Sequence, residues 1–332
     1  MRMAAGNMTE QEFLNLLAAR AGSCARGELG IGDDAALLAV PDGRLLVTTD
    51  AFVEGIHFPS WASPAQVARR CVIAALSDIN AMGGTGRDLF VALGLPPRKS
   101  RHLPKYLDAL LETCVEFGLR LMGGDTVASP KGMLSLTVTG VLSQGKAPLT
   151  RVGARPGDFI HVSGPLGRMG LAVARVAQGW KSVRGRAVPP AGGEPGLPDA
   201  PDSLAYFFSP QMPYPLGRDL LLSGKVTACM DISDGLSTDL TRLCDASGVG
   251  AEVEGERLPA APEVVAAIAD ERERLDLLLA SGEEFQLLFT SSEELPWPVI
   301  GRMTPGTECV LHWKGTASPL RTTGYDHFRH PA

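Results

Sequence analysis

The sequence lacks the spacings that mark several common kinds of site. Its six cysteines include no C-x-x-C pair, and its six histidines show no H-E-x-x-H or other paired spacing, so a catalytic zinc site is not expected. No apolar run approaches the roughly 18 residues that a membrane span requires, and no segment resembles a signal peptide. We therefore expect a cytoplasmic protein with reduced cysteines and no membrane partner.

An excess of basic residues is also absent. Lys and Arg total 31 against 37 for Asp and Glu, so the formal net charge is -6 and no overall basic field recruits nucleic acid. Hydrophobic residues make up 45% and charged residues 20% of the chain, which is ordinary globular composition. A small-molecule partner is therefore expected.

The chain is long enough for two domains, because 332 residues exceed the usual size of a single core. From Gly30 to about Gln144, short apolar strands alternate with amphipathic helices, and a new alternation begins near Arg151 after the turn-like Q-G-K-A-P. This pattern predicts a mixed α/β (α+β) protein with domains at residues 1–147 and 148–332.

One helix is predicted over residues 63–82, with Ser63 as its N-cap and Gly83 just past its end. Asp78 falls on its apolar stripe and is expected to point inward. Because a buried carboxylate is costly unless it is paired, hydrogen-bonded or bound to metal, Asp78 needs a partner.

Other segments are predicted from periodicity alone. The predicted elements are a buried strand over Leu45–Thr49 that places Asp50 at its mouth, a core-packing helix over 104–117, strands over 134–142 and 159–162, and a mobile surface loop in the Gly- and Pro-rich stretch Lys181–Asp202. No chemistry is assigned to the second helix.

Four short motifs place aspartates beside Gly, Ser or Thr. They are G-I-G-D-D-A-A at 30–36, T-T-D at 48–50, G-G-D-T at 123–126 and D-I-S-D-G-L at 231–236. Mg²⁺ prefers oxygen ligands and usually takes only one or two carboxylates, with water and substrate phosphates completing its shell. Each motif alone is also ordinary turn or N-cap chemistry. Their repetition favours several magnesium ions on one polyphosphate.

In order along nearly the whole chain, these motifs and their neighbours resemble the thiamine-monophosphate kinases, within the superfamily that includes aminoimidazole ribonucleotide synthetase. The matching segments are G-I-G-D-D-A-A, T-T-D-A-F-V-E-G-I-H-F, A-L-S-D-I-N-A-M-G, G-G-D-T, R-V-G-A-R-P-G-D, D-I-S-D-G-L-S-T-D-L and G-Y-D-H-F. The resemblance implies transfer of the ATP γ-phosphoryl group to thiamine monophosphate. It also implies a homodimer whose N-terminal sheets pair into a barrel, a C-terminal α/β domain and an active site in the cleft between domains.

The resemblance implies roles for individual residues as well. Positions matching magnesium ligands are Asp34, Thr48, Thr49, Asp50, Asp78, Asp125, Asp231 and Asp234; those matching ATP contacts are Gly124, Asp125, Arg151 and Ser233; those matching substrate contacts are His57, Glu283 and Tyr325. No side chain is nominated as a general base, because an acceptor phosphate is already ionised near neutral pH.

The sequence departs from the family at 281–287, where S-G-E-E-F-Q-L stands in place of the common G-G-E-D-Y-E-L. Glu283 is kept, but substrate contacts in this segment are less firmly predicted. Two alternatives stay open: another ATP-using synthetase of the superfamily, or a nucleotide-binding maturation scaffold without turnover.

Overall fold

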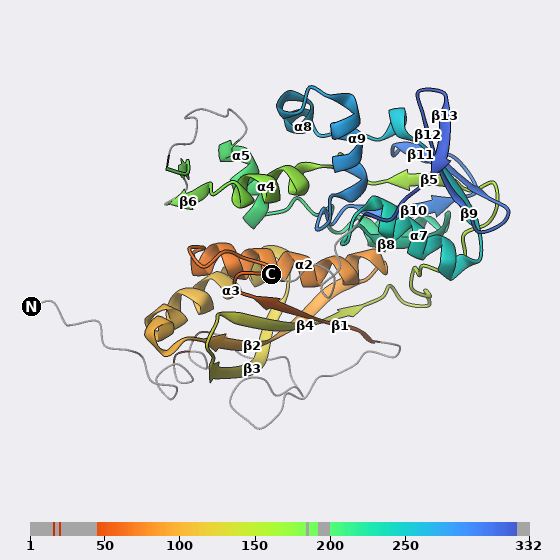
Figure 1. The fold of residues 1–332 in the computed structure, drawn as a ribbon. Coiled ribbons are helices and arrows are strands. Elements are labelled where there is room, and N and C mark those ends of the chain that lie inside the picture. The colour runs from red at the N-terminus through yellow and green to blue at the C-terminus, as the bar shows by residue number, and fades with distance from the viewer. Residues whose placement is uncertain (1–15, 17–19, 21–44, 184–185, 192–199, 324–332) are drawn as a thin grey trace, which may run out of the picture. The chain divides into compact units, whose positions relative to one another are not determined.

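The computed structural model describes residues 16, 20, 45–183, 186–191 and 200–323 (Figure 1). Two of the predicted site residues, Asp34 and Tyr325, lie outside these ranges. None of the described helices is both long and apolar enough to cross a membrane.

Contacts divide the chain into two compact units. Of the residues described from 45 onward, unit 1 comprises 45–79 and 84–145, and unit 2 comprises 80–83 and those from 146 to 323. The five cysteines that the structure describes form no disulfide, and four of them are buried.

Unit 1 is built on a four-stranded sheet with the order β1-β4-β2-β3. Its strands are β1 (Leu45–Val53), β2 (Thr85–Leu95), β3 (Arg120–Ala128) and β4 (Met133–Val141), and only β2 and β3 run parallel. The helices α2 (Pro64–Ala81) and α3 (Leu103–Phe117) cover one face of this sheet, and the 3-10 helix η1 (Pro97–His102) leads into α3 (Figure 1).

Helix α2 begins and ends where its cap residues predict. The Ser63 N–H donates to Gln66 Oε1 at 2.9 Å, and the Gln66 N–H donates back to Ser63 Oγ at 3.3 Å, which is the reciprocal pattern of a capping box. Gly83 follows with φ +76°, a conformation that favours glycine. Helix α3 also ends as predicted, at Gly118 with φ +69°.

Strand β1 differs from the prediction. It continues to Val53 through pairing with β4, so Asp50 lies within the strand rather than at its mouth. Among the described strands, β1 lies at the edge of its sheet, and Val47 on the face away from α2 is 59% exposed, so β1 is not a buried strand. An apolar run cannot show where pairing with a neighbouring strand stops, and the end of β1 was therefore predicted too early in the sequence.

Unit 2 contains a seven-stranded sheet with the order β13-β12-β9-β11-β5-β10-β8. Its strands are β5 (Phe159–Val162), β8 (Val226–Asp231), β9 (Gly250–Glu254), β10 (Leu287–Ser291), β11 (Val299–Thr304), β12 (Cys309–Trp313) and β13 (Thr316–Pro319). Its helices are α4 (Arg168–Ala177), α5 (Ala200–Phe208), α6 (Leu216–Ser223), α7 (Leu236–Ser247), α8 (Pro262–Ala267) and α9 (Glu271–Ala280), with the 3-10 helix η2 (Gly255–Arg257) after β9.

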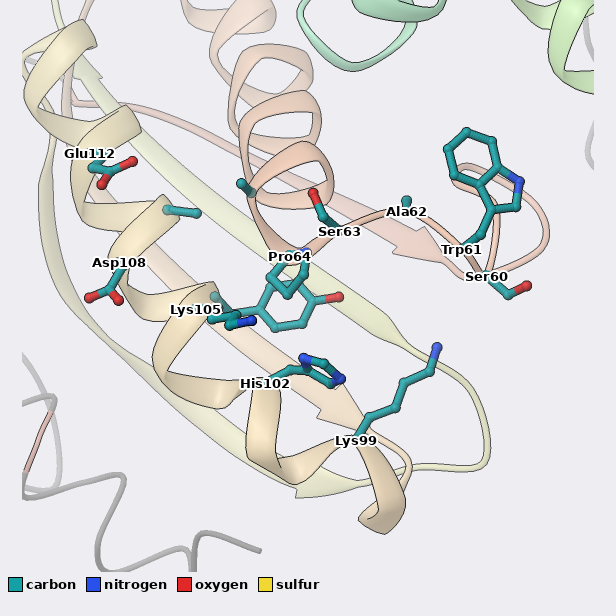
Figure 2. Close-up of a pocket in the computed structure, with 13 residues that line it drawn as sticks. Ser60, Trp61, Ala62, Ser63, Pro64, Lys99, His102, Lys105, Asp108 and Glu112 are labelled. Carbon is teal, nitrogen blue, oxygen red and sulfur yellow. The ribbon is translucent and has the colours of Figure 1, made fainter. Parts of the chain in front are cut away.

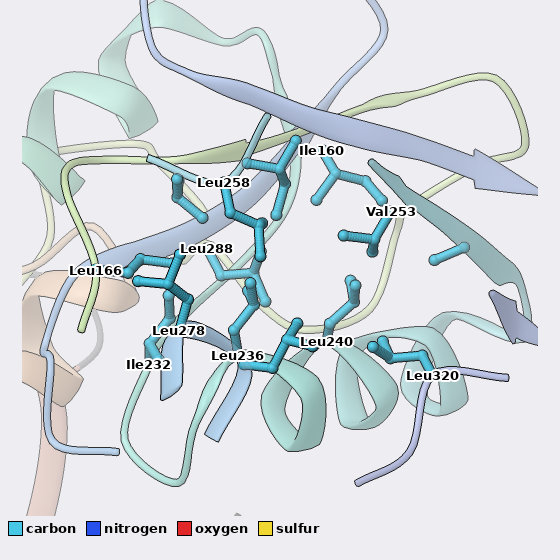
Figure 3. Close-up of a cluster of buried hydrophobic side chains, with 14 of the residues drawn as sticks. Ile160, Leu166, Ile232, Leu236, Leu240, Val253, Leu258, Leu278, Leu288 and Leu320 are labelled. Carbon is cyan, nitrogen blue, oxygen red and sulfur yellow. The ribbon is translucent and has the colours of Figure 1, made fainter. Parts of the chain in front are cut away.

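The core of unit 2 lies between this sheet and α7, α8 and α9. Figure 3 shows Leu236 and Leu240 of α7 in the same cluster as Ile160 and Leu288 of the sheet, all fully buried. This packing fixes the start of α7 and the end of β8, which carry the D-I-S-D-G-L motif.

The stretch Lys181–Asp202 is not simply a loop. Lys181–Val183 (β6) pairs with Arg186–Val188 (β7), and α5 begins at Ala200. Trp180 and Leu204 are buried together beside this hairpin, so the segment has a small core of its own. The loop prediction is therefore wrong for the two hairpin strands and for the start of α5, because such short strands leave too few residues for a periodic pattern.

Candidate functional site

The structure joins two of the predicted metal ligands of unit 1. Thr48 Oγ1 donates to Asp78 Oδ2 at 2.6 Å, so α2 and β1 bring together residues 30 positions apart. Asp50 lies two residues beyond Thr48 and therefore on the same face of β1. Asp78 is partly exposed rather than buried, and Thr48 is the hydrogen-bonding partner that the sequence did not identify.

Thr49 and Asp125 lie on the opposite face of the sheet. Thr49 Oγ1 is 2.8 Å from Thr137 Oγ1, and Asp125 belongs to the register row that crosses the sheet through Ala92 and Ser135 to Ala51. Because β1 and β3 are separated by three strand spacings, these two edges lie roughly 14 Å apart. Within unit 1, Asp125 therefore lies on a different face and at a different edge of the sheet from Asp50 and does not share a site with Asp50 and Asp78.

Gly124 has a structural role beside its predicted contact with ATP. A Cβ atom at this position would lie 1.9 Å from the Val91 carbonyl oxygen of the neighbouring strand. Only glycine therefore allows β3 to pair with β2 at this point.

The E-G-I-H-F segment forms a tight turn after β1. The Val53 N–H donates to His57 Nδ1 at 3.0 Å, so the neutral imidazole carries its proton on Nε2. Arg70 Nε donates to the His57 carbonyl oxygen at 3.0 Å, and Glu54 Oε2 accepts from Lys99 Nζ at 2.9 Å and from the Gly132 N–H at 3.0 Å. His57 is thus held in one tautomer as a hydrogen-bond donor through Nε2.

In unit 2, the D-I-S-D-G motif wraps around a carboxylate that the sequence analysis did not single out. Asp239 is fully buried, and its Oδ2 accepts from the N–H groups of Ser233, Asp234 and Gly235 at 2.9, 2.9 and 3.1 Å. Arg242 donates to Asp239 Oδ1 at 3.1 Å and is ion-paired with Asp234. The loop that carries Asp234 is therefore fixed from the first turn of α7.

The S-G-E-E-F-Q-L segment lies against the same loop. The Glu283 N–H donates to the Ser233 carbonyl oxygen at 2.7 Å, and a Cβ at Gly282 would also lie 2.7 Å from that oxygen. Asp231 ends β8 with 3% exposure and is paired in register with Leu287. Predicted metal, ATP and substrate positions thus come together in unit 2.

Arg151 lies apart from this group. Its carbonyl oxygen accepts from Ser247 Oγ at 2.9 Å, and Ser247 is the last residue of α7, whereas Ser233 precedes the first. The 12 residues of α7 separate the two positions by roughly 18 Å along the helix.

The donor chemistry fits magnesium. The predicted ligands offer carboxylate and hydroxyl oxygens only, which are the ligands that Mg²⁺ prefers. Among the described residues, no group of three His, Cys, Asp or Glu side chains is placed to hold a metal ion. A carboxylate that supplies one or two ligands, with phosphate oxygens and water supplying the rest, is the arrangement expected for magnesium that binds together with a nucleotide.

A cavity of about 520 Å³ lies between the start of α2 and the start of α3 (Figure 2). Lys99, His102 and Lys105 contribute its basic groups, and Trp61 and Tyr106 contribute its aromatic rings. Burial and the neighbouring cations lower the pKa of His102. None of the predicted site residues that the structure describes lines this cavity, although the basic run from Arg98 to Lys105 was visible in the sequence.

Comparisons with known proteins agree with the family resemblance of the sequence. The AIR synthase related protein family matches through its N-terminal domain at residues 32–142 and its C-terminal domain at residues 155–314. A curated thiamine-monophosphate kinase of Escherichia coli (strain K12) is 32% identical over 321 residues, covering 92% of this chain and 93% of that protein. The chain belongs to the thiamine-monophosphate kinase family.

Solved structures of thiamine-monophosphate kinases share the fold. The enzyme of Stenotrophomonas maltophilia K279a matches with a TM-score of 0.76 and 28% identity, covering 92% of this chain and 95% of its own. AaThiL complexed with AMPPCP and TMP matches with a TM-score of 0.74 and 25% identity, covering 96% and 97%. The predicted family and mixed α/β fold are confirmed, and membership of a kinase family makes the chain an enzyme rather than a scaffold.

Proposed function

We propose that this chain phosphorylates thiamine monophosphate to thiamine diphosphate, with ATP as the donor. The proposal rests on two clusters of side chains whose oxygen atoms could bind Mg²⁺. One cluster in unit 1 contains Thr48, Asp50 and Asp78, and the other in unit 2 contains Asp231 and Asp234. The name of the Escherichia coli relative and the ligands in the AaThiL complex support the same donor and acceptor.

The residues present would bind magnesium through these carboxylates. When bound, Mg²⁺ supplies positive charge to the phosphate oxygens during transfer, as in other phosphoryl-transfer enzymes. The chain itself then has to align the two anions, for which His57 Nε2 and Glu283 are the proposed acceptor contacts and Ser233 a proposed contact to ATP. No side chain is proposed as a base, and transfer is direct.

A panel of acceptors tests this proposal. With purified protein and MgATP, thiamine monophosphate should yield thiamine diphosphate and ADP in equal amounts, whereas thiamine and aminoimidazole- or formylglycinamide-type acceptors should not consume ATP. Radiolabelled ATP without acceptor should leave no label on the protein. A labelled phosphoprotein would exclude direct transfer, and turnover with a different acceptor alone would exclude the proposed substrate.

We also propose that unit 1 forms a homodimer through the open face of its sheet. Val47 on β1 and Val127 on β3 are 59% and 49% exposed, which leaves apolar side chains on both edges of that face. Light scattering should give twice the 35.0 kDa mass of the chain. Val47→Glu should shift the protein to monomer, whereas Val115→Glu on the outside of α3, where Val115 is 82% exposed, should not. A monomeric wild-type protein would contradict the proposal.

A further inference from the structure

The segment Ser281–Gln286 is attached on one side to the D-I-S-D loop through its backbone. The Glu283 N–H donates to the Ser233 carbonyl at 2.7 Å, and the Phe285 N–H donates to the Ile232 carbonyl at 3.0 Å. Ile232 in turn donates its N–H to the Gln286 carbonyl at 2.8 Å. These bonds tie one edge of the segment to the D-I-S-D loop.

On its other side, the segment caps helix α4 through side chains. Glu284 is fully buried, and its Oε1 accepts from the Gly167 N–H at 2.9 Å and the Met169 N–H at 3.1 Å. Ser281 Oγ accepts from the Gly170 N–H at 2.7 Å and donates to Glu284. The N-cap residue Gly167 offers no side-chain cap, so α4 obtains its capping groups from this distant segment.

The residues immediately before and after Glu284 both have an uncommon backbone conformation. Glu283 has φ +53° and Phe285 has φ +52°, in the left-handed region that residues with a Cβ adopt rarely. Such a conformation persists only where the surroundings hold it, and it occurs often at ligand sites. Besides the backbone bonds to the D-I-S-D loop, the side chain of Glu284, the one residue between them, anchors the segment to α4.

We propose that Glu284 is a positioning residue: by capping α4, it holds the left-handed backbone of Glu283 and so directs the Glu283 side chain toward the acceptor substrate. This inference rests on the proposed function, in which Glu283 contacts thiamine monophosphate. It also gives a role to the departures Ser281 and Glu284 from the common family sequence, because both belong to the same cap.

The chemistry of Glu284 suggests the informative variants. Burial raises its pKa to about 7, and the charged and titratable side chains facing it are Arg168 and Tyr206. Glu284→Gln keeps an oxygen acceptor of the same reach without the charge. Glu284→Asp keeps the charge but is one methylene shorter, so it cannot reach the first turn of α4 without backbone movement.

Hydrogen exchange tests the structural half of the inference without substrate. In Glu284→Asp, amide exchange should speed up by about tenfold both at residues 167–170 and at Glu283 and Phe285. Glu284→Gln and the exposed control Glu308→Gln should match the wild type. Faster exchange confined to α4 would overturn the inference, because Glu284 would then cap the helix without holding Glu283.

Steady-state kinetics tests the substrate half. Glu284→Asp should raise the KM for thiamine monophosphate by about tenfold, while the KM for ATP and kcat change less than about twofold. Glu284→Gln should have the same KM for thiamine monophosphate as the wild type. An equal rise in both KM values would indicate a general loss of structure and would overturn the inference. If the wild type neither binds nor turns over thiamine monophosphate, the proposed function fails along with the substrate half. The exchange experiment then still decides whether Glu284 holds Glu283.

Discussion

Replacing Asp50 with Asn is expected to lower kcat by about 10²- to 10⁴-fold while the protein remains folded. A bound metal ion stabilises transition-state charge by several kcal/mol, and each 1.36 kcal/mol corresponds to a factor of about ten in rate. Asp50 lies on the same face of β1 as Thr48, which is hydrogen-bonded to Asp78, and we propose that its carboxylate shares a metal ion with Asp78. Steady-state assays with MgATP and thiamine monophosphate measure the effect.

The fold should tolerate this substitution because Asn has the same shape and Asp50 is only partly buried on an edge strand. We expect a change in the free energy of unfolding below ~1 kcal/mol. The matched control is Asp276→Asn, which removes a surface carboxylate ion-paired with Arg272, both side chains being 56% exposed. Full activity of the Asp50→Asn variant would contradict the proposal that Asp50 is a metal ligand.

Replacing Gly124 with Ala is expected to destabilise the protein by roughly 3 kcal/mol or more, even without nucleotide. The new methyl group would meet the Val91 carbonyl oxygen at 1.9 Å, and relieving this contact requires β2 and β3 to separate. Overpacking of this kind typically costs about 1–3 kcal/mol, and a backbone atom cannot move aside as a side chain does. Urea denaturation of the nucleotide-free protein measures the loss.

The adjacent residue provides the control. A Cβ at Gly123 would lie 3.6 Å from the Phe90 ring, which is an ordinary contact, so Gly123→Ala should leave stability nearly unchanged. If Gly124→Ala were as stable as the wild type but bound ATP weakly, Gly124 would be a nucleotide contact and not a packing position.

Elements with local end signals could be predicted from the sequence. Ser63 predicted the start of α2, and the glycines at 83 and 118 predicted the ends of α2 and α3, because capping depends on residues only a few positions apart. The family could also be identified, since its motifs occur in order along most of the chain. By contrast, the hairpin after Trp180 has strands of three residues each, which are too short to show a period.

The relative placement of the site residues could not be predicted, because it depends on pairing between distant segments. Which face Asp125 takes follows from the register of β3 on β2, and the approach of Asp78 to Thr48 follows from how α2 packs on the sheet. Asp239 and Glu284 were missed for the same reason. An acidic residue in the first turn of α7 was a weak signal for Asp239, whereas nothing near Glu284 in the sequence indicates that it caps α4.

Magnesium-dependent formation of thiamine diphosphate by the purified protein tests the central claim most directly. With ATP and thiamine monophosphate present, product should be absent in excess chelator, and it should appear in proportion as free Mg²⁺ is restored. Product formation that is unchanged in chelator would contradict the role assigned to the carboxylates, and a protein that binds MgATP but forms no thiamine diphosphate at any Mg²⁺ concentration would contradict the proposed reaction.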